Sequence, residues 1–326
     1  MSALDTTAGA ARRPFQGRRT RLGDLLLQGT AGLAAAGAVV LVGLIAWKLV
    51  EGAKLSLSTF GLGFLSTVAW DPNPAHAKFG AAIFLYGTVV TSLGALVLAT
   101  PLAIGIALFL SELAPRAIRA PVTALVETLA AIPSVVIGLW GIIVLAPVLA
   151  DDVEPRLHSV LGFIPLFGPP GVGENLFAAI VVLTMMILPI VSSISRELFL
   201  GVPVELKEAA LGLGTTRWEM VRGVVLPYAR GGVAAAMILG LGRAVGEAVA
   251  VALVVGSGFG IDVNLFNPGN TIGATLANNY QGASSGLELS SLVYLALILL
   301  VFSLLVNVIA QLIVRRISRR QGVAAR

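Results

Sequence analysis

The sequence predicts an all-α membrane protein with six transmembrane helices. Hydrophobic residues make up 57% of the 326 residues and charged residues only 12%, whereas about 25% of the residues of a soluble domain are charged. The mean hydropathy of the chain is +0.93. Most charges also lie outside the long apolar runs, so composition and charge placement both indicate a polytopic membrane protein.

Each predicted helix corresponds to one apolar run. A helix that crosses a hydrocarbon core of about 30 Å needs about 20 mostly apolar residues. Six runs are long enough for this, and they cover residues 29–47, 79–111, 128–150, 175–195, 231–256 and 289–314.

Two prolines are expected to shape these spans. Pro101 in the second span and Pro133 in the third each remove a backbone hydrogen bond, so each is expected to bend its helix. The hydroxyl of Ser134 can bond a carbonyl that Pro133 frees. Ser134 either packs against a neighbouring helix or lines a pore, and the sequence leaves both interpretations open.

The distribution of Lys and Arg predicts that both termini lie inside (N-in, C-in). With the amino terminus inside, 17 of the 22 Lys and Arg residues fall in the two tails and the two inner loops. The outer loops hold only Lys54, Lys78 and Arg156. Cytoplasmic segments of membrane proteins carry such an excess of positive charge.

This orientation divides the chain into four expected parts. Residues 1–21 form a cytoplasmic tail, 22–79 the first transmembrane helix with an outer segment, 80–314 a five-helix core, and 315–326 a second cytoplasmic tail. The first apolar run is longer than the core of a signal peptide, and no convincing small-residue cleavage site follows it. It is therefore interpreted as an uncleaved helix.

The inner loop at 201–227 predicts a helical hairpin. Its sequence is GVPVELKEAALGLGTTRWEMVRGVVLP. Pro203 suits the first turn of a helix, and Gly214 suits the left-handed residue that follows its end. Thr216, with Glu219 three residues later, predicts a capping box for a second helix. Such a hairpin either lies on the membrane surface or docks a partner that approaches its small residues closely.

Arg243 and Glu247 are the charged residues of the fifth span, which is otherwise uncharged from residue 231 to 256. On a continuous helix they would lie one turn apart on the same face and could touch. A charge at this depth costs at least about 2.5 kcal/mol, so something must solvate it. Either the two residues neutralise each other and fasten helices together, or they line an aqueous path. Gly242 and Gly246 have the spacing of a helix-contact motif, and a direct ligand role is the alternative.

Several chemistries are excluded or not expected. The chain has no Cys, which excludes disulfides, thiolate metal sites and cysteine nucleophiles. His76 and His158 fall in polar loops, so no metal site is expected. No Lys follows a Gly, so the phosphate-binding loop of an ATPase is missing and the chain is not expected to be an enzyme. The positive charges flank apolar runs, which favours membrane lipid over nucleic acid as their partner.

The hairpin also carries a motif. Residues 208–227 contain E-A-A, three residues, Gly, nine residues and V-x-L-P. This pattern resembles the EAA loop of bacterial ABC-importer permeases of the MetI-like family. The resemblance implies that Glu208, Ala209, Ala210 and Gly214 belong to a coupling helix that sits in a cleft of a cytoplasmic ATPase.

Five further stretches narrow the resemblance to the PstC-type permeases of bacterial phosphate ABC transporters. They are FGLGFLSTVAWDP (60–72), FLSELAPR (109–116), AAIPSVVIGLWG (130–141), GLGRAVGE (240–247) and LFNPGNT (265–271). The likeness extends from about residue 22 to residue 316.

The resemblance implies a type I ABC importer permease fold in the bacterial inner membrane. The chain would be the transmembrane permease subunit of an ATP-driven inorganic phosphate importer, and Arg243 and Glu247 would line the substrate path as it alternates between inward and outward access. The implied partners are a second homologous permease (PstA-like), two ATPase subunits (PstB-like) and an extracytoplasmic phosphate-binding protein (PstS-like). No cofactor is expected in this chain, because the partner ATPase would use ATP and Mg.

Three other functions remain open. The chain could be a permease for another oxyanion such as sulfate or molybdate, or a membrane subunit that senses phosphate. It could also be a stand-alone secondary transporter, in which broken helices near charged residues also occur. The hairpin favours the ABC permease over the stand-alone transporter, which has no use for a docking element.

Overall fold

The computed structural model describes residues 20–73 and 75–322. The predicted cytoplasmic tail up to residue 19, and the last residues 323–326, lie outside the described residues. The chain divides into two compact units between Lys48 and Leu49. The first unit contains most of helix α1 (Thr20–Phe60), and its side chains from Gly23 to Ile45 are exposed.

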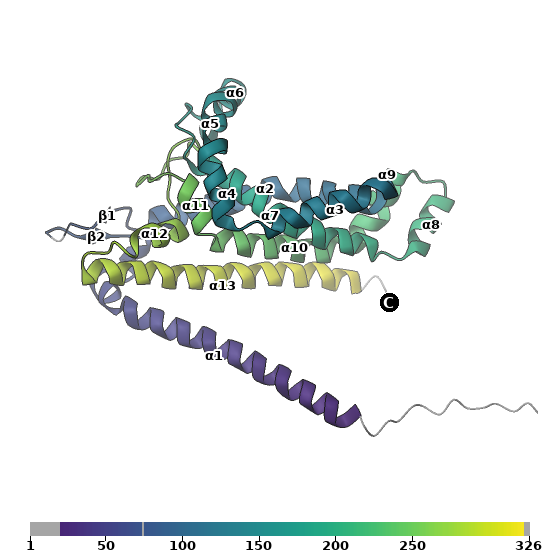
Figure 1. Ribbon diagram of the computed structural model, residues 1–326, viewed down its shortest axis with the longest axis horizontal. Helices are drawn as coiled ribbons and strands as arrows, with labels where there is room; N and C mark the ends of the chain where they lie inside the picture. The colour runs from purple at the N-terminus through teal and green to yellow at the C-terminus, as the bar shows by residue number, and fades with distance from the viewer. Residues whose placement is uncertain (1–19, 74, 323–326) are drawn as a thin grey trace, which may run out of the picture. The chain divides into compact units, whose positions relative to one another are not determined.

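The second unit contains the remaining elements, which are almost all helical (Figure 1). In chain order the helices are α2 (Ala82–Leu108), α3 (Arg116–Ala131), α4 (Ser134–Trp140), α5 (Ala146–Val148), α6 (Glu154–Leu161), α7 (Leu176–Leu200), α8 (Val204–Gly212), α9 (Arg217–Met220), α10 (Leu226–Gly246), α11 (Val249–Val254), α12 (Ile272–Asn279) and α13 (Gly286–Gly322). Strands β1 (Trp70–Asp71) and β2 (Lys78–Phe79) pair antiparallel.

The predicted number of spans is confirmed for the described part of the chain. Six helical stretches are long and apolar enough to cross a membrane: Gly23–Leu65, Ala82–Leu113, Ser134–Leu161, Leu176–Leu200, Arg217–Gly246 and Gly286–Val314. Three of them extend through π-helical turns, at Phe109–Leu113 after α2, at Gly141–Leu145 and Leu149–Val153 in the third stretch, and at Val221–Val225 before α10.

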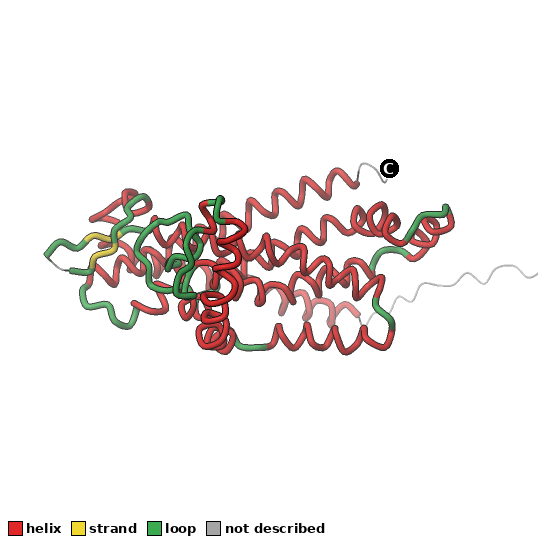
Figure 2. Tube along the Cα trace, turned by 90° about the horizontal axis from the view of Figure 1, so that it is seen from above, coloured by secondary structure: helices red, strands yellow, loops and turns green. Residues whose placement is uncertain are grey.

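Helices α2, α7, α10 and α13 lie side by side and form the body of the second unit (Figures 1 and 2). The helix α7 is the most buried of the six spans. It packs closely on α2, because every fourth residue of one face of α2 is a fully buried alanine: Ala95, Ala99, Ala103 and Ala107. Small side chains let two helix backbones approach, which is how helices associate in a membrane.

The third span differs from its prediction, which placed one helix over residues 128–150 with a kink at Pro133. The helix breaks instead: α3 ends at Ala131, Ile132 is extended with ψ 128°, and α4 begins at Ser134. The ring of a proline disfavours helical backbone in the residue before it. The helical stretch then continues to Leu161, so the apolar span runs further toward the outer side than predicted.

The fifth span also differs from its prediction, which placed it over residues 231–256. The helix already begins at Arg217 and ends at Gly246. The apolar residues beyond Gly246 belong to a separate short helix, α11. The break between α10 and α11 falls at Glu247 and Ala248, beside Arg243.

The two ends of the second unit are built differently (Figure 1). Helices α8 and α9 lie at one end, which the distribution of positive charge assigns to the inner side. The short helices α6, α11 and α12 and the strand pair lie at the other. In the N-in orientation this second group is the outer end of the protein.

A buried carboxylate organises the outer end. Glu154 of α6 is fully buried, and its Oε2 accepts a hydrogen bond from the N–H of Gly171 at 2.9 Å. Its Oε1 accepts one from Nδ2 of Asn175 at 2.7 Å. The oxygen of the same amide, Oδ1, caps α7 by accepting from the N–H of Ala178. The outer loop is therefore tied directly to the start of the central helix.

A second outer loop is closed by Asp262. Its Oδ1 accepts from the N–H of Asn264 at 2.9 Å, and its Oδ2 accepts from Nδ2 of Asn267 at 2.6 Å. These two bonds hold the pKa of the Asp262 carboxyl below its ordinary value of 3.8. A carboxyl with a lowered pKa stabilises the folded loop above that ordinary value, and the contribution is lost as the pH falls through the lowered value.

Helices α4 and α11 approach each other so closely at Gly138 that a side chain does not fit there without a shift. An added Cβ at Gly138 of α4 would lie 2.8 Å from the Cα of Ala250 in α11, so the backbones would have to separate. We expect Gly138→Ala to lower the stability of the protein by about 1–3 kcal/mol. The measurement is thermal unfolding in detergent.

The matched control is Gly105→Ala in α2, where an added Cβ meets no atom within 4 Å. This variant is expected to unfold at or above the wild-type temperature, because alanine favours a helix over glycine by about 1 kcal/mol. Equal unfolding temperatures for the two variants would contradict the close contact of α4 with α11.

Candidate functional site

The coupling hairpin (residues 201–227) forms as predicted. The helix α8 runs from Val204 to Gly212 after Pro203, and Gly214 has a positive φ of 88°. The predicted capping box is present: the N–H of Glu219 donates to the hydroxyl of Thr216, and the N–H of Thr216 donates to Glu219 Oε2 at 2.8 Å. The turn between α8 and α9 is therefore defined by local signals.

The motif residues of the hairpin are accessible. Glu208, Ala209 and Gly214 are exposed, and Ala210 is half-buried. None of the residues of α8 is fully buried, although the second helix of the hairpin buries Met220 in an apolar cluster with Phe199 and Val202. One face of α8 is thus free to be covered by another subunit.

The Arg243–Glu247 region has a geometry that the sequence did not predict. Arg243 lies in the last turn of α10 and its side chain is exposed. The helix ends at Gly246, and the backbone of Glu247 is extended with ψ 124°. Glu247 still follows Arg243 by one turn, but within the described residues no hydrogen bond or ion pair joins the two side chains, so the contact that the sequence allows is not formed.

Glu247 has a structural partner of its own. Its Oε1 accepts from the N–H of Ala250 at 3.3 Å, which caps the start of α11. Arg243 makes no hydrogen bond or ion pair with any residue in the described ranges. Since the C-terminal end of a helix is partially negative, the end of α10 favours a cation there. No acidic side chain in the described part of the chain neutralises the guanidinium.

Arg243 lies toward the outer end of the fifth span. The helical stretch that begins at Arg217 ends at Gly246, only three residues beyond Arg243. Because residues up to Pro227 belong to the inner hairpin, the length from Pro227 to Arg243 stays about 24 Å at about 1.5 Å per residue.

The glycines around Arg243 have different surroundings. An added Cβ at Gly242 would lie 3.6 Å from Oδ1 of Asn307 in α13, whereas one at Gly246 would meet nothing within 4 Å. Within the described residues only Gly242 lies near another helix of this chain, and helix contact through both glycines stays a prediction. The close contact of α10 with α7 is made at Gly240, where an added Cβ would lie 2.9 Å from Val191.

Ser134 begins α4, directly after the break at Pro133. Its side chain is half-buried. In the described part of the chain its hydroxyl bonds no carbonyl, so the predicted repair of a carbonyl freed by Pro133 is not seen. The carbonyl of Leu129, which the missing N–H of Pro133 leaves without its helical donor, accepts instead from the N–H of Ile132.

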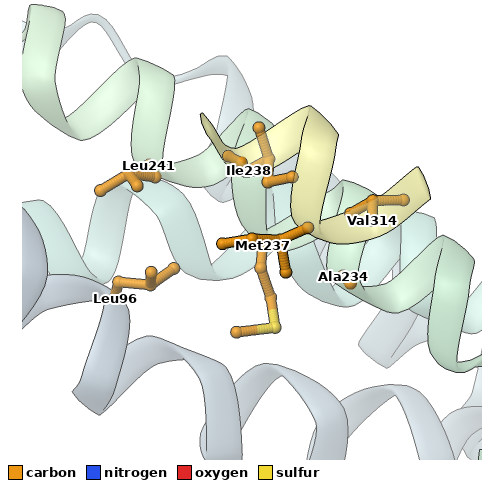
Figure 3. Close-up of a pocket in the computed structure, with 8 residues that line it drawn as sticks. Leu96, Ala234, Met237, Ile238, Leu241 and Val314 are labelled. Atoms are coloured by element: carbon orange, nitrogen blue, oxygen red, sulfur yellow. The ribbon is translucent and has the colours of Figure 1, made fainter. Parts of the chain in front are cut away.

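An apolar cavity of about 190 Å³, which no sequence pattern indicated, lies between α2, α10 and α13 (Figure 3). It is lined by Leu96, Ala234, Met237, Ile238, Leu241, Ala310, Ile313 and Val314. These side chains offer no hydrogen bond to an anion, so the cavity differs in character from the surroundings of Arg243. Among the described residues, no group of three or more His, Asp or Glu side chains could hold a metal ion.

Six apolar helical stretches, a broken span with an unneutralised arginine, and an accessible inner hairpin are the features of a polytopic membrane permease. Comparison with protein families gives a match over residues 99–319 to the inner membrane component of binding-protein-dependent transport systems. Among solved structures, a bacterial alginate ABC transporter in complex with its periplasmic protein aligns with 90% of this chain and 97% of its own, with a TM-score of 0.61 and 16% identity. This second likeness concerns the fold alone.

Curated relatives are closer in sequence. The phosphate transport system permease protein PstC of Mesorhizobium japonicum is 44% identical over 328 residues, covering 99% of this chain and 100% of the relative. PstC 2 of Mycobacterium tuberculosis is 41% identical, covering 91% of this chain and 93% of the relative. The chain belongs to the inner membrane components of binding-protein-dependent transport systems, and within them to the PstC permeases. The resemblance seen in the sequence is confirmed.

Glu247 can stabilise the break between α10 and α11 through its hydrogen bond to the N–H of Ala250 or through the charge of its carboxylate. We expect Glu247→Ala to fray α11 and lower the stability of the complex by about 1 kcal/mol, the usual effect of losing a cap. Glu247→Gln keeps the Oε1 acceptor for Ala250 and should unfold at the wild-type temperature. Thermal unfolding of both variants checks this. An equal loss of stability in the two variants would show that the charge, not the cap, stabilises this region.

Proposed function

We propose that this chain is the permease subunit of an ATP-driven importer of inorganic phosphate and forms half of the translocation path by alternating access. Membership in the PstC permeases supports the substrate, since the relatives are phosphate transport proteins by name. The exposed and unneutralised guanidinium of Arg243 carries the proposal within the structure.

Arg243 has the chemistry to meet an oxyanion. A guanidinium presents a planar fork of donors that matches two oxygens of a phosphate. An isolated charge in a span is costly unless it faces water, another charge or a passing ion. The side chain of Arg243 is exposed and is not covered by the described residues around it. The surface on which it lies would therefore line the translocation path.

Glu247 completes the proposed substrate path. Phosphate near neutral pH keeps at least one proton, and a carboxylate can accept a hydrogen bond from it. Oε1 is engaged with the N–H of Ala250, while Oε2 has no partner among the described residues. A carboxylate near the guanidinium also weakens anion binding, so that phosphate leaves rather than stays, as conduction requires. Ser134, Gly242 and Gly246 are secondary candidates for this wall.

The other half of the path would come from a second homologous permease. This PstA-like subunit would place its own arginine opposite Arg243. A PstS-like binding protein would dock on the outer loops, over residues 52–79, 151–174 and 257–287. The family name supports a binding protein as a partner. In this assembly the chain would keep the four parts predicted from its sequence: two cytoplasmic tails, a first helix with an outer segment, and a five-helix core.

The inner hairpin of this chain would receive one of two PstB-like ATPases, and the second permease would receive the other. Glu208 and Ala209 are exposed on α8, and Gly214 is exposed at its end, so an ATPase cleft can close around this helix without displacing buried side chains. Closure of the ATPase dimer on ATP would then move the hairpin and reopen the path outward.

The substrate path is tested at Arg243. We expect Arg243→Gln to lower phosphate uptake by about 10- to 150-fold, because a hydrogen bond to a charged group contributes about 1.5–3 kcal/mol and each 1.4 kcal/mol is tenfold. The complex should still assemble, since no bond within the described chain depends on this side chain. The measurement is ATP-driven uptake of labelled phosphate by vesicles.

Arg230→Gln is the matched control, because this exposed arginine lies on the same helix near its inner end. It should leave uptake within about twofold of wild type, as expected of exposed surface positions. Normal uptake by Arg243→Gln would remove Arg243 from the path. Competition by sulfate as strong as that by unlabelled phosphate would instead identify a permease for another oxyanion.

Docking of the ATPase is tested at Ala209. We expect Ala209→Phe to abolish retention of the ATPase during purification, because the bulky ring would hold the ATPase cleft away from α8. Ala117→Phe, at an exposed alanine of α3 outside the hairpin, is the control and should retain the ATPase. Copurification from membranes measures both, and a wild-type yield of ATPase with Ala209→Phe would contradict the coupling role.

A further inference from the structure

A buried ion pair ties the coupling hairpin to the spans. Nζ of Lys207 in α8 lies 2.6 Å from Oε1 of Glu112, and the two side chains are only 15% and 11% exposed. The same Nζ donates a hydrogen bond to the carbonyl of Phe199 at 3.0 Å. The Arg156–Asp152 pair at the outer end differs, with side chains 78% and 56% exposed.

The three partners belong to three different elements. Lys207 is on α8, Glu112 is in the π-helical turn that ends the second span, and Phe199 is in the last turn of α7, the central span. The carbonyls in the last turn of a helix lack partners within that helix. One ammonium group therefore joins the hairpin to the inner ends of two neighbouring spans.

Apolar packing alone does not fix the orientation of α8. None of its side chains is fully buried, and apolar contact is non-directional. An ion pair with a second hydrogen bond is directional, and its geometry must be kept for the buried charge to remain compensated. Exposed pairs contribute little, since water and salt screen them. The burial of Lys207 and Glu112 makes this contact stiff.

We propose that Lys207 is a positioning residue that transmits the movement of α8 to α2 and α7, with Glu112 and the Phe199 carbonyl as its two anchors. The inference rests on the proposed docking of an ATPase on α8. Lys207 itself is half-buried beneath the exposed motif residues Glu208 and Ala209. It connects the surface on which the ATPase would act to the helices that would move.

The test compares transport with ATP hydrolysis in the complete complex reconstituted in vesicles. We expect Lys207→Met to keep the ATPase bound and hydrolysing ATP, while phosphate taken up per ATP falls about tenfold or more, as expected when one partner of a buried pair is lost. Lys207→Arg keeps the charge and the donors and should recover most of the uptake per ATP. A purely structural role would lower both activities together.

Glu112, the partner of Lys207 at the end of the second span, is tested with a variant of its own and a control. Glu112→Gln should also lower uptake per ATP, because it leaves the ammonium without its counter-charge. Glu127→Gln changes an exposed acid of α3 that has no bond in the described chain, and it should behave as wild type. Unchanged uptake per ATP in both Lys207→Met and Glu112→Gln would overturn the proposal.

A further variant covers the case in which Lys207→Met does not assemble. The double variant Lys207→Met/Glu112→Leu leaves no uncompensated charge, and replacing a buried pair by apolar residues is often neutral for stability. It should assemble and still transport less phosphate per ATP. Wild-type uptake per ATP by this variant would overturn the proposal as well.

Docking and transmission can fail separately. The chain has no Cys, so Ala209→Cys gives a single thiol on α8 for cross-linking to the ATPase. Absence of a cross-link in the otherwise wild-type chain would contradict docking on α8. If the cross-link forms but uptake per ATP is unchanged in Lys207→Met, the docking proposal stands and only the proposed transmission through Lys207 is contradicted.

Discussion

Backbone hydrogen bonding in a bilayer is the constraint on which this structure depends. A span must satisfy its N–H and C=O groups internally, and non-helical backbone is tolerated only against protein or water. The chain breaks its helices at Ile132–Pro133 and at Glu247–Ala248. At the first break the carbonyl of Pro133 accepts from two N–H groups of the next helix. At the second, the side chain of Glu247 accepts from Ala250.

At the second break Arg243 has no partner among the described residues of its own chain. Glu247 follows it by one turn, but Oε1 of Glu247 accepts from the N–H of Ala250 at the start of α11 and not from the guanidinium. Arg243 is therefore available to water, substrate or a second subunit. The inner end of the protein has the opposite arrangement, since the largely buried ammonium of Lys207 pairs with Glu112 and donates to the carbonyl of Phe199.

Much of the coupling hairpin could be predicted from the sequence, because its signals are local. Pro203, Gly214 and the capping box of Thr216 act within a few residues of their own positions, and the structure places each as expected. The ends of the third and fifth spans could not be predicted in the same way. Hydropathy marks apolar residues on both sides of Glu247, and the choice between one helix and two depends on the contacts of α11 with α4 at Gly138 and of the break with α12 at Gly273.

The sequence by itself determined the class of the protein, the number of spans and the hairpin, since each follows from composition, run length or local capping. It also marked Arg243 and Glu247, because charges in an apolar run are rare at any position. Only the tertiary structure decided that the two are not paired, that Gly246 is open while Gly240 packs on α7, and that Lys207 meets Glu112. These outcomes depend on which residues distant in sequence come together, and a pattern read along one chain does not contain that information.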